Sequence, residues 1–122
     1  MLAETWRVWV IIVALTVVSG IGDAYGFTHA ALIWQSGRLA WTEVAHSAAG
    51  FAFGVAVYWY VLKFMAAVGI VAPEIQTIAW FAVTLIGVAL ISRKFLDWTR
   101  LDQLVAVAVL AGIAWLLVRT GE

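Results

Sequence analysis

The sequence predicts an all-α integral membrane protein whose four transmembrane helices form an antiparallel bundle. Of its 122 residues, 66% are hydrophobic and only 11% are charged, and the mean hydropathy is +1.04. A soluble domain of this size normally carries about a quarter charged residues. Long apolar runs without strict alternation favour helices, because in lipid only helices and closed barrels satisfy the backbone. The whole chain, residues 1–122, is expected to form one such domain.

The first expected helix covers residues 6–35, and the second covers residues 42–72. Thr5 is placed to cap the first helix, Gly37 to end it in the left-handed conformation, and Thr42 to cap the second. Both helices exceed the roughly 20 residues that cross a bilayer, so they are expected to tilt or to protrude into the headgroup zone.

The third expected helix covers residues 73–93, and Pro73 suits its first position because that position needs no backbone N–H donor. The fourth covers residues 100–118. Thr99 and Asp102 form the capping-box pattern at its start. Four spans place both ends of the chain on one side of the membrane.

Charge and residue type exclude several functions. Seven basic and seven acidic residues give a net charge of zero, so no basic surface for nucleic acid is expected. Without cysteine, the chain offers no thiolate nucleophile, disulfide or iron–sulfur ligand. No pattern pairs a nucleophile with a base, forms a phosphate loop or joins two acids at a reaction centre, so neither catalysis nor a resident cofactor is expected.

Two histidines and one acid form a possible metal site. If the first two helices turn near Gly37, His29 precedes the turn by eight residues and His46 follows it by nine, so both imidazoles lie at a similar depth. Glu43 and His46 are three residues apart and share a helical face. His29, Glu43 and His46 would then form a two-histidine, one-carboxylate metal cluster. Alternatively, these are interfacial polar residues satisfied by water, carbonyl groups and one another.

The same two histidines also suit a haem b, as its axial ligands. The stretch HSAAGFAFGVAVY, from His46 to Tyr58, resembles the membrane-anchor subunit of succinate dehydrogenase, which has H-x-x-x-G and then a tyrosine at that distance. That family has an acid before the tyrosine, where this chain has Val57. The resemblance implies a haem- or quinone-binding site that uses His29, His46 and Tyr58.

Asp23 is the deepest acid, 18 residues after Thr5. An acid that faces lipid at the midplane costs about 3 kcal/mol, so Asp23 is expected to face a partner within the protein. Tyr25, Tyr58 and Lys63 are the possible partners, and Asp23 and Lys63 are the two polar residues expected to be buried. A proton or ion pathway centred on Asp23 is the functional alternative.

Glycines recur four residues apart in both of the first two helices. Gly22 and Gly26 lie in the first helix, and Gly50 and Gly54 lie in the second. Such pairs let helix backbones approach closely in membranes. They predict a tight seam between these two helices, or else an interface between chains.

The most polar stretch joins the third and fourth helices. It carries Arg93, Lys94, Asp97, Arg100 and Asp102. These residues favour a solvated loop, with binding of an anionic lipid headgroup as the alternative.

The charged connection and its flanking helices, ALISRKFLDWTRLDQLVAVAVLAGIAWLLVR, resemble the phosphate-starvation-inducible PsiE family of small inner-membrane proteins. Arg93, Asp97 and Asp102 match the charged connection of that family, and His29 falls near a histidine at the end of its first helix. The resemblance implies a four-helix polytopic protein with no assigned chemistry and no catalytic residues to transfer.

Together, these features predict a small polytopic membrane protein without catalytic activity, in the bacterial cytoplasmic (inner) membrane. It is expected to act as an accessory subunit of a membrane complex or as a homo-oligomer, with lipids, other membrane subunits or its own copies as partners. The alternative is a haem- or metal-binding subunit for electron transfer that uses His29 and His46.

Overall fold

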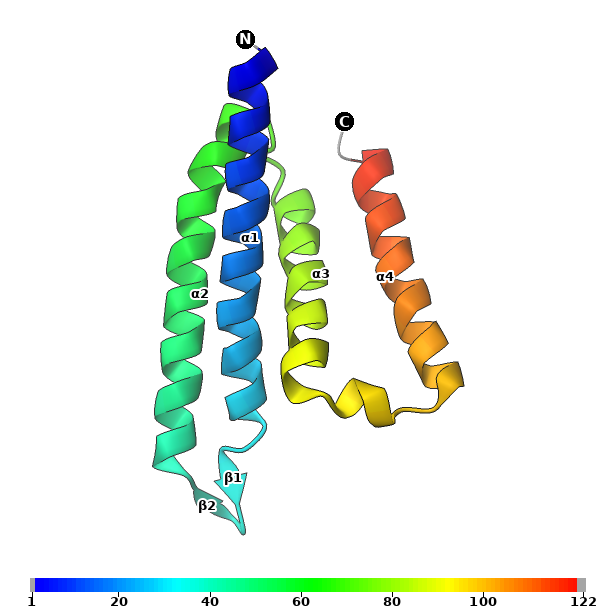
Figure 1. The fold of residues 1–122 in the computed structure, drawn as a ribbon. Helices are drawn as coiled ribbons and strands as arrows, with labels where there is room; N and C mark the ends of the chain where they lie inside the picture. Colours follow the sequence, from blue (N-terminus) through cyan, green and yellow to red (C-terminus); the bar gives the residue numbers. More distant parts are fainter. Residues whose placement is uncertain (1, 121–122) are drawn as a thin grey trace.

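The chain is all-helical apart from one short hairpin (Figure 1). The structure, a computed structural model, describes residues 2–120. Its elements in chain order are α1 (Leu2–Ala30), β1 (Trp34–Gln35), β2 (Arg38–Leu39), α2 (Trp41–Ala67), α3 (Pro73–Ser92), the 3-10 helix η1 (Lys94–Asp97) and α4 (Arg100–Thr120).

Three helices are long and apolar enough to cross a membrane. They are Thr5–Ala30 within α1, with a mean hydropathy of 1.9, α2 with 1.4 and α3 with 2.0. The prediction of a helical protein with membrane-spanning segments is confirmed to this extent.

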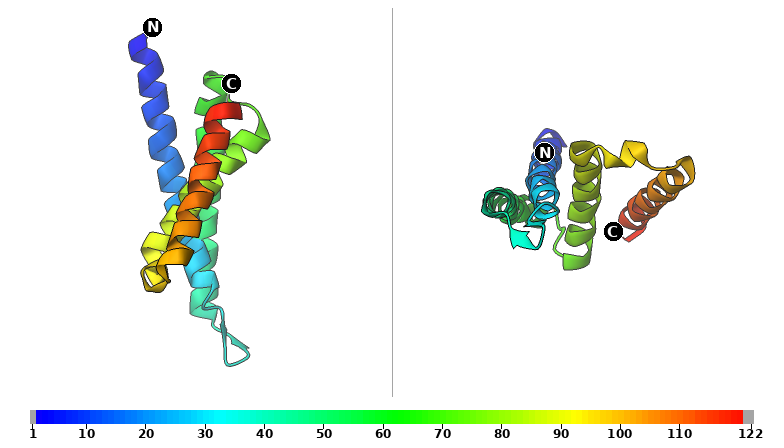
Figure 2. Two further views of the ribbon diagram at one scale, coloured as in Figure 1. Left: turned by 90° about the vertical axis from the view of Figure 1, so that its right-hand side faces the viewer. Right: turned by 90° about the horizontal axis from the view of Figure 1, so that it is seen from below.

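The helices stand in a row rather than in a closed bundle. Figure 1 and the right-hand view of Figure 2 show α1 between α2 and α3, with α4 on the outer side of α3. α1 packs against both α2 and α3, whereas the neighbour of α4 is α3. The predicted bundle of four transmembrane helices is therefore not confirmed: among the described residues, three helices could span a membrane, and α1 packs between α2 and α3. α4 is an outlying helix, and its Gly112 has open space where a Cβ would be.

Glycines allow the close packing of α1 on α2, as predicted. A Cβ on Gly50 would lie 2.7 Å from the backbone N of Gly26 and 2.8 Å from the carbonyl oxygen of Gly22, distances that real side chains do not adopt. Two hydroxyls tie the backbones together across this seam: Ser19 Oγ donates to the Gly54 carbonyl at 2.7 Å, and Ser47 Oγ donates to the Gly26 carbonyl at 2.8 Å. These four glycines are thus used inside the chain, not between chains.

The segment between α1 and α2 differs from the prediction. α1 ends at Ala30 instead of residue 35, and the strands of the hairpin pair Trp34 with Leu39. Ser36 and Gly37 form its two-residue turn, with φ of 53° and 76°. Two successive positive φ angles define the type I′ turn that fits the twist of paired strands. Gly37 is left-handed, as expected, but it closes a hairpin instead of ending a helix.

Other helix boundaries also shift. Thr5 lies inside α1, and α2 begins at Trp41 with Ala40 as N-cap and no side-chain cap, so neither Thr5 nor Thr42 caps a helix. α2 ends at Ala67, five residues early, because the following chain turns through the left-handed Gly69.

The predictions for the ends of α3 and for the start of α4 agree better with the structure. α3 begins at Pro73 as predicted and ends at Ser92, where Arg93 adopts a left-handed conformation. Thr99 Oγ1 accepts a hydrogen bond from the backbone N–H of Asp102 at 3.3 Å, which is the N-terminal half of the predicted capping box.

Candidate metal centre

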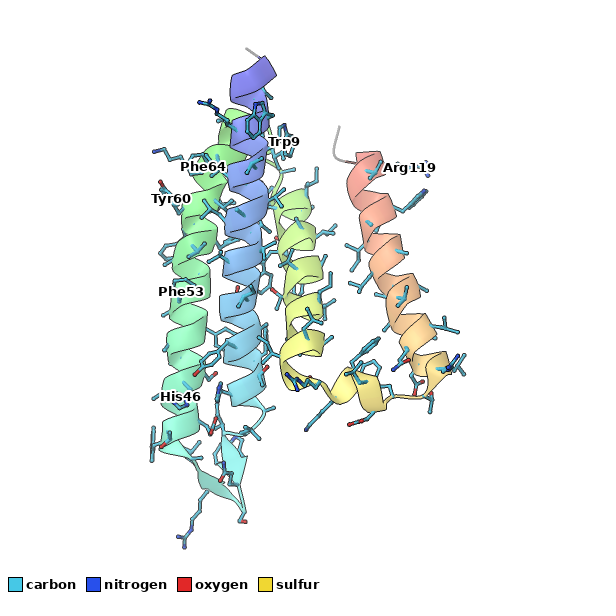
Figure 3. All side chains as sticks on the ribbon, viewed as in Figure 1. Trp9, His46, Phe53, Tyr60, Phe64 and Arg119 are labelled. Atoms are coloured by element: carbon cyan, nitrogen blue, oxygen red, sulfur yellow. The ribbon has the colours of Figure 1, made fainter. Side chains whose placement is uncertain are left out.

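The seam between α1 and α2 places three possible ligands at the hairpin end of the molecule. His29 lies in the last turn of α1, Glu43 lies in the first turn of α2, and His46 lies one turn further on. Figure 3 labels His46 near the hairpin end of α2. Because the glycine seam fixes the register of the two helices, the three side chains meet at one depth.

The three side chains are close enough to share an ion. One nitrogen from each histidine and one oxygen from Glu43 all lie within 4.8 Å of one another. His29 Nδ1 and Glu43 Oε2 form a hydrogen bond, and both side chains are about one-fifth exposed. His46 is exposed. The cluster therefore opens to the surroundings on the side of His46.

Tyr25 covers the inner side of the cluster. Its ring centroid lies 4.3 Å from that of His29, one helical turn later, and 6.3 Å from that of His46. The two imidazole rings lie 4.9 Å apart at 64°, edge to face. Tyr25 thus packs closely on His29 and lies beside His46.

The donor set fits a divalent transition metal. Imidazole nitrogens and a carboxylate oxygen bind Zn²⁺ at about 2.0–2.2 Å, which places tetrahedral ligands about 3.4 Å apart. Relative to 4.8 Å, the most distant pair would need to close by up to about 1.4 Å. Rotation of the exposed His46 side chain can supply this movement without moving a helix.

Glu43 has two possible roles in such a site. It could bind the metal through a carboxylate oxygen, as the third ligand. It could instead keep its hydrogen bond to Nδ1 of His29 and orient Nε2 towards the metal, as outer-shell carboxylates do in many zinc sites.

The structure does not gather the three residues of the predicted haem or quinone site at one position. The rings of His29 and His46 contact each other directly. Tyr58 follows His46 by 12 residues, which is about 18 Å along a helix. Its ring packs on Trp80 at 6.3 Å, far from the histidines.

Asp23 is fully buried, as predicted, but its partner was not anticipated. Trp80 Nε1 of α3 donates a hydrogen bond to Asp23 Oδ2. Neither Tyr25, Tyr58 nor Lys63 forms a hydrogen bond with it among residues 2–120. A tryptophan in the middle of a membrane span, away from the headgroup zone, needs a buried acceptor for its N–H. The position of Trp80 in the sequence could therefore have indicated a buried acceptor such as Asp23.

Lys63 was expected to be buried and is instead exposed on α2. Its Nζ lies 5.9 Å from the ring centroid of Phe64, near the α2–α3 connection. The packed face of α2 is the one that carries Gly54, Val61 and Met65, and Lys63 lies off this face.

The charged side chains of the connection between α3 and α4 are exposed. Arg93, Lys94, Asp97, Arg100 and Asp102 are all exposed. Within the described chain, no ion pair joins Arg93 to Asp97. The arrangement agrees with a solvated connection and does not gather these charges around one position.

No protein-family model, curated protein or solved structure matches the chain.

Proposed function

We propose that this chain is a polytopic membrane protein that binds one divalent transition-metal ion at the hairpin end of α1 and α2. The observation that carries the proposal is the convergence of His29, Glu43 and His46 within 4.8 Å, from two helices whose register the glycine seam fixes. Two imidazoles and one carboxylate favour Zn²⁺, Fe²⁺ or Co²⁺ over Mg²⁺ or Ca²⁺, which prefer oxygen ligands.

The bound ion would join α1 to α2 and keep at least one coordination position open. Tyr25 occupies the inner side, so water or a partner's ligand would reach the ion from the side of His46. Three protein ligands with one open position are typical of sites that exchange or activate a ligand, whereas closed four-ligand sites are structural.

Isothermal titration of purified protein with Zn²⁺ tests this proposal. The protein is produced without a polyhistidine tag and reconstituted in lipid nanodiscs. We expect one ion per chain, with affinity lowered at least tenfold in His29→Ala and in His46→Ala. Glu74→Gln is the matched control, because Glu74 is an exposed acid in the first turn of α3 and should leave binding unchanged.

Two variants of Glu43 distinguish its possible roles. If the carboxylate binds the ion, Glu43→Gln and Glu43→Ala weaken affinity alike, whereas an orienting role is largely kept by the amide oxygen of Gln. Binding that persists with unchanged affinity and stoichiometry in the His29→Ala, His46→Ala double variant would refute the proposal.

A second candidate function is association with other membrane proteins, as an accessory subunit without catalytic activity or as a homo-oligomer. We propose that such contacts use α4 as a fourth membrane-spanning helix, because its small residues Ala108, Ala111 and Gly112 are all exposed.

Native mass spectrometry from nanodiscs measures the association of the isolated chain. If copies associate through α4, we expect a dimer or larger species that Gly112→Leu weakens and Gly37→Ala does not. A monomer in the wild type at all protein-to-lipid ratios would contradict the homo-oligomer.

A further inference from the structure

A stripe of polar side chains runs inside the membrane-spanning part of α1. Thr16, Ser19 and Asp23 lie on one side of the helix and are 8%, 0% and 0% exposed. Ser19 is satisfied by the Gly54 carbonyl. Thr16 Oγ1 and Asp23 Oδ1 are buried with no hydrogen-bond partner. Buried polar atoms nearly always have a hydrogen-bond partner in folded proteins, so the lack of a partner at these two atoms needs a physical explanation.

The two oxygens of Asp23 have different surroundings. Oδ2 accepts the hydrogen bond from Trp80 Nε1. Oδ1 points to the backbone of α2, because a Cβ on Gly54 would overlap it. A proton adds almost no volume, so this close packing accommodates it.

No positive group compensates a charge on Asp23. The groups that face it are Ser19 on its own helix, Gly54 of α2 and Trp80 of α3, and none of these is basic. Within residues 2–120, the ion pair of the structure is His29 with Glu43, one and a half turns or more away from Asp23. A buried carboxylate without a positive partner is costly, whereas the protonated acid is neutral.

α3 adds a second unpaired hydroxyl at the same level. Trp80, Thr84 and Gly87 lie on one side of α3 at helical spacing. Trp80 bonds to Asp23, and a Cβ on Gly87 would lie 2.8 Å from the Cβ of Ala24. Thr84 lies between these two contacts, and its Oγ1 is buried without a partner.

A cavity of about 400 Å³ lies on the N-terminal side of the stripe, between α1, α3 and the end of α2, and Thr16 and Gln76 are the polar residues in its otherwise apolar lining. Asp23 is not among the lining residues. Packing encloses Asp23 in both directions along α1, because Val83 lies where a Cβ on Gly20 would be and Phe51 lies where a Cβ on Gly26 would be.

We propose that Asp23 is a proton-binding site within the membrane. On loading, a hydronium ion transfers its proton to the carboxylate and leaves as water, and on release the proton returns to water. Nothing is oxidised or reduced. The site is separate from the metal centre and does not depend on it.

Infrared difference spectroscopy of the protein in nanodiscs tests this site. A protonated carboxyl group gives a C=O stretching band that a carboxylate lacks. We expect this band in the wild type at neutral pH and its loss in Asp23→Asn, which keeps an acceptor for Trp80. Asp97→Asn, an exposed acid in η1, is the matched control and should keep the band. Absence of the band at pH 7 in folded wild-type protein would overturn the proposal.

Two further measurements distinguish a bound proton from a bound cation. Trp80→Phe removes the donor to Oδ2, so the band should shift to higher frequency while helix content by circular dichroism stays unchanged. Addition of Na⁺ at constant pH should leave the band unchanged, and a band that disappears would show a cation site instead.

Discussion

Substitution of Gly50 by alanine tests how tightly the seam between α1 and α2 is packed. The new Cβ would lie 2.7 Å from Gly26 N and 2.8 Å from Gly22 O, where ordinary contact begins at 3.4 Å. Both contacted atoms belong to the backbone of α1, so no side chain can rotate away. The two helices must separate by about 0.7 Å at this level.

The cost follows from the contacts that this separation weakens. Overpacking a close-packed site costs about 1–3 kcal/mol. The hydrogen bonds of Ser19 and Ser47, now 2.7 and 2.8 Å, would stretch towards 3.5 Å and lose about 0.6 kcal/mol each. The higher helix propensity of alanine relative to glycine offsets about 1 kcal/mol of this loss of stability. We therefore expect Gly50→Ala to lower the free energy of unfolding by about 2 kcal/mol.

Unfolding in mixed micelles of mild detergent and dodecyl sulfate, followed by circular dichroism, measures this change. Gly112→Ala is the matched control, because Gly112 is also helical but a Cβ at this position would have nothing within 4 Å. It should be neutral or stabilising by up to about 1 kcal/mol. If Gly50→Ala is as stable as Gly112→Ala, the close backbone contact between α1 and α2 is refuted.

Three further predictions concern the seam, the hairpin and the metal. Ser19→Ala removes the bond to the Gly54 carbonyl and should cost about 0.6 kcal/mol in the same unfolding assay, and no loss would show that this bond is not made. Gly37→Val forces a β-branched residue to a φ of 76°, at a cost of about 1–2 kcal/mol, and should speed deuterium exchange of the hairpin amides while leaving α3 unchanged. Zn²⁺ at 100 times its dissociation constant should stabilise the wild type by about 2.7 kcal/mol, and His46→Ala should abolish this gain.

Residue counting along the expected helices was enough to predict that His29, Glu43 and His46 lie close together. Counting residues to either side of Gly37 put His29 and His46 at one depth, and the shared face of Glu43 and His46 followed from their spacing. The glycine pairs predicted which two helices pack closely, which fixes the register that brings these three side chains together. Whether they bind an ion stays a prediction.

Rotation of the helices about their axes was harder to infer. α2 and α3 are apolar on almost all sides, so their sequences give no amphipathic phase that tells which face is packed. Lys63 was therefore assigned to the interior, and the bond from Trp80 to Asp23 was missed. The outlying position of α4 was missed for the same reason, since the sequence of an apolar helix is alike whether it faces protein or lipid.

The hairpin was missed because its strands continue an apolar run. Residues Leu32 to Trp34 extend the hydrophobic pattern of α1 beyond Ala30, and no proline interrupts it. The backbone changes direction because Ser36 and Gly37 both take positive φ, and serine alone gives little sign of this conformation.

X-ray absorption at the zinc edge of the Zn²⁺-loaded protein in nanodiscs measures the metal centre most directly. The structure predicts a first shell with two imidazole nitrogens at about 2.0–2.1 Å and a carboxylate or water oxygen at about 2.0–2.2 Å. The His46→Ala protein should show one imidazole fewer. A shell of oxygen atoms alone, or one unchanged by His46→Ala, would contradict a metal centre built by the meeting of α1 and α2.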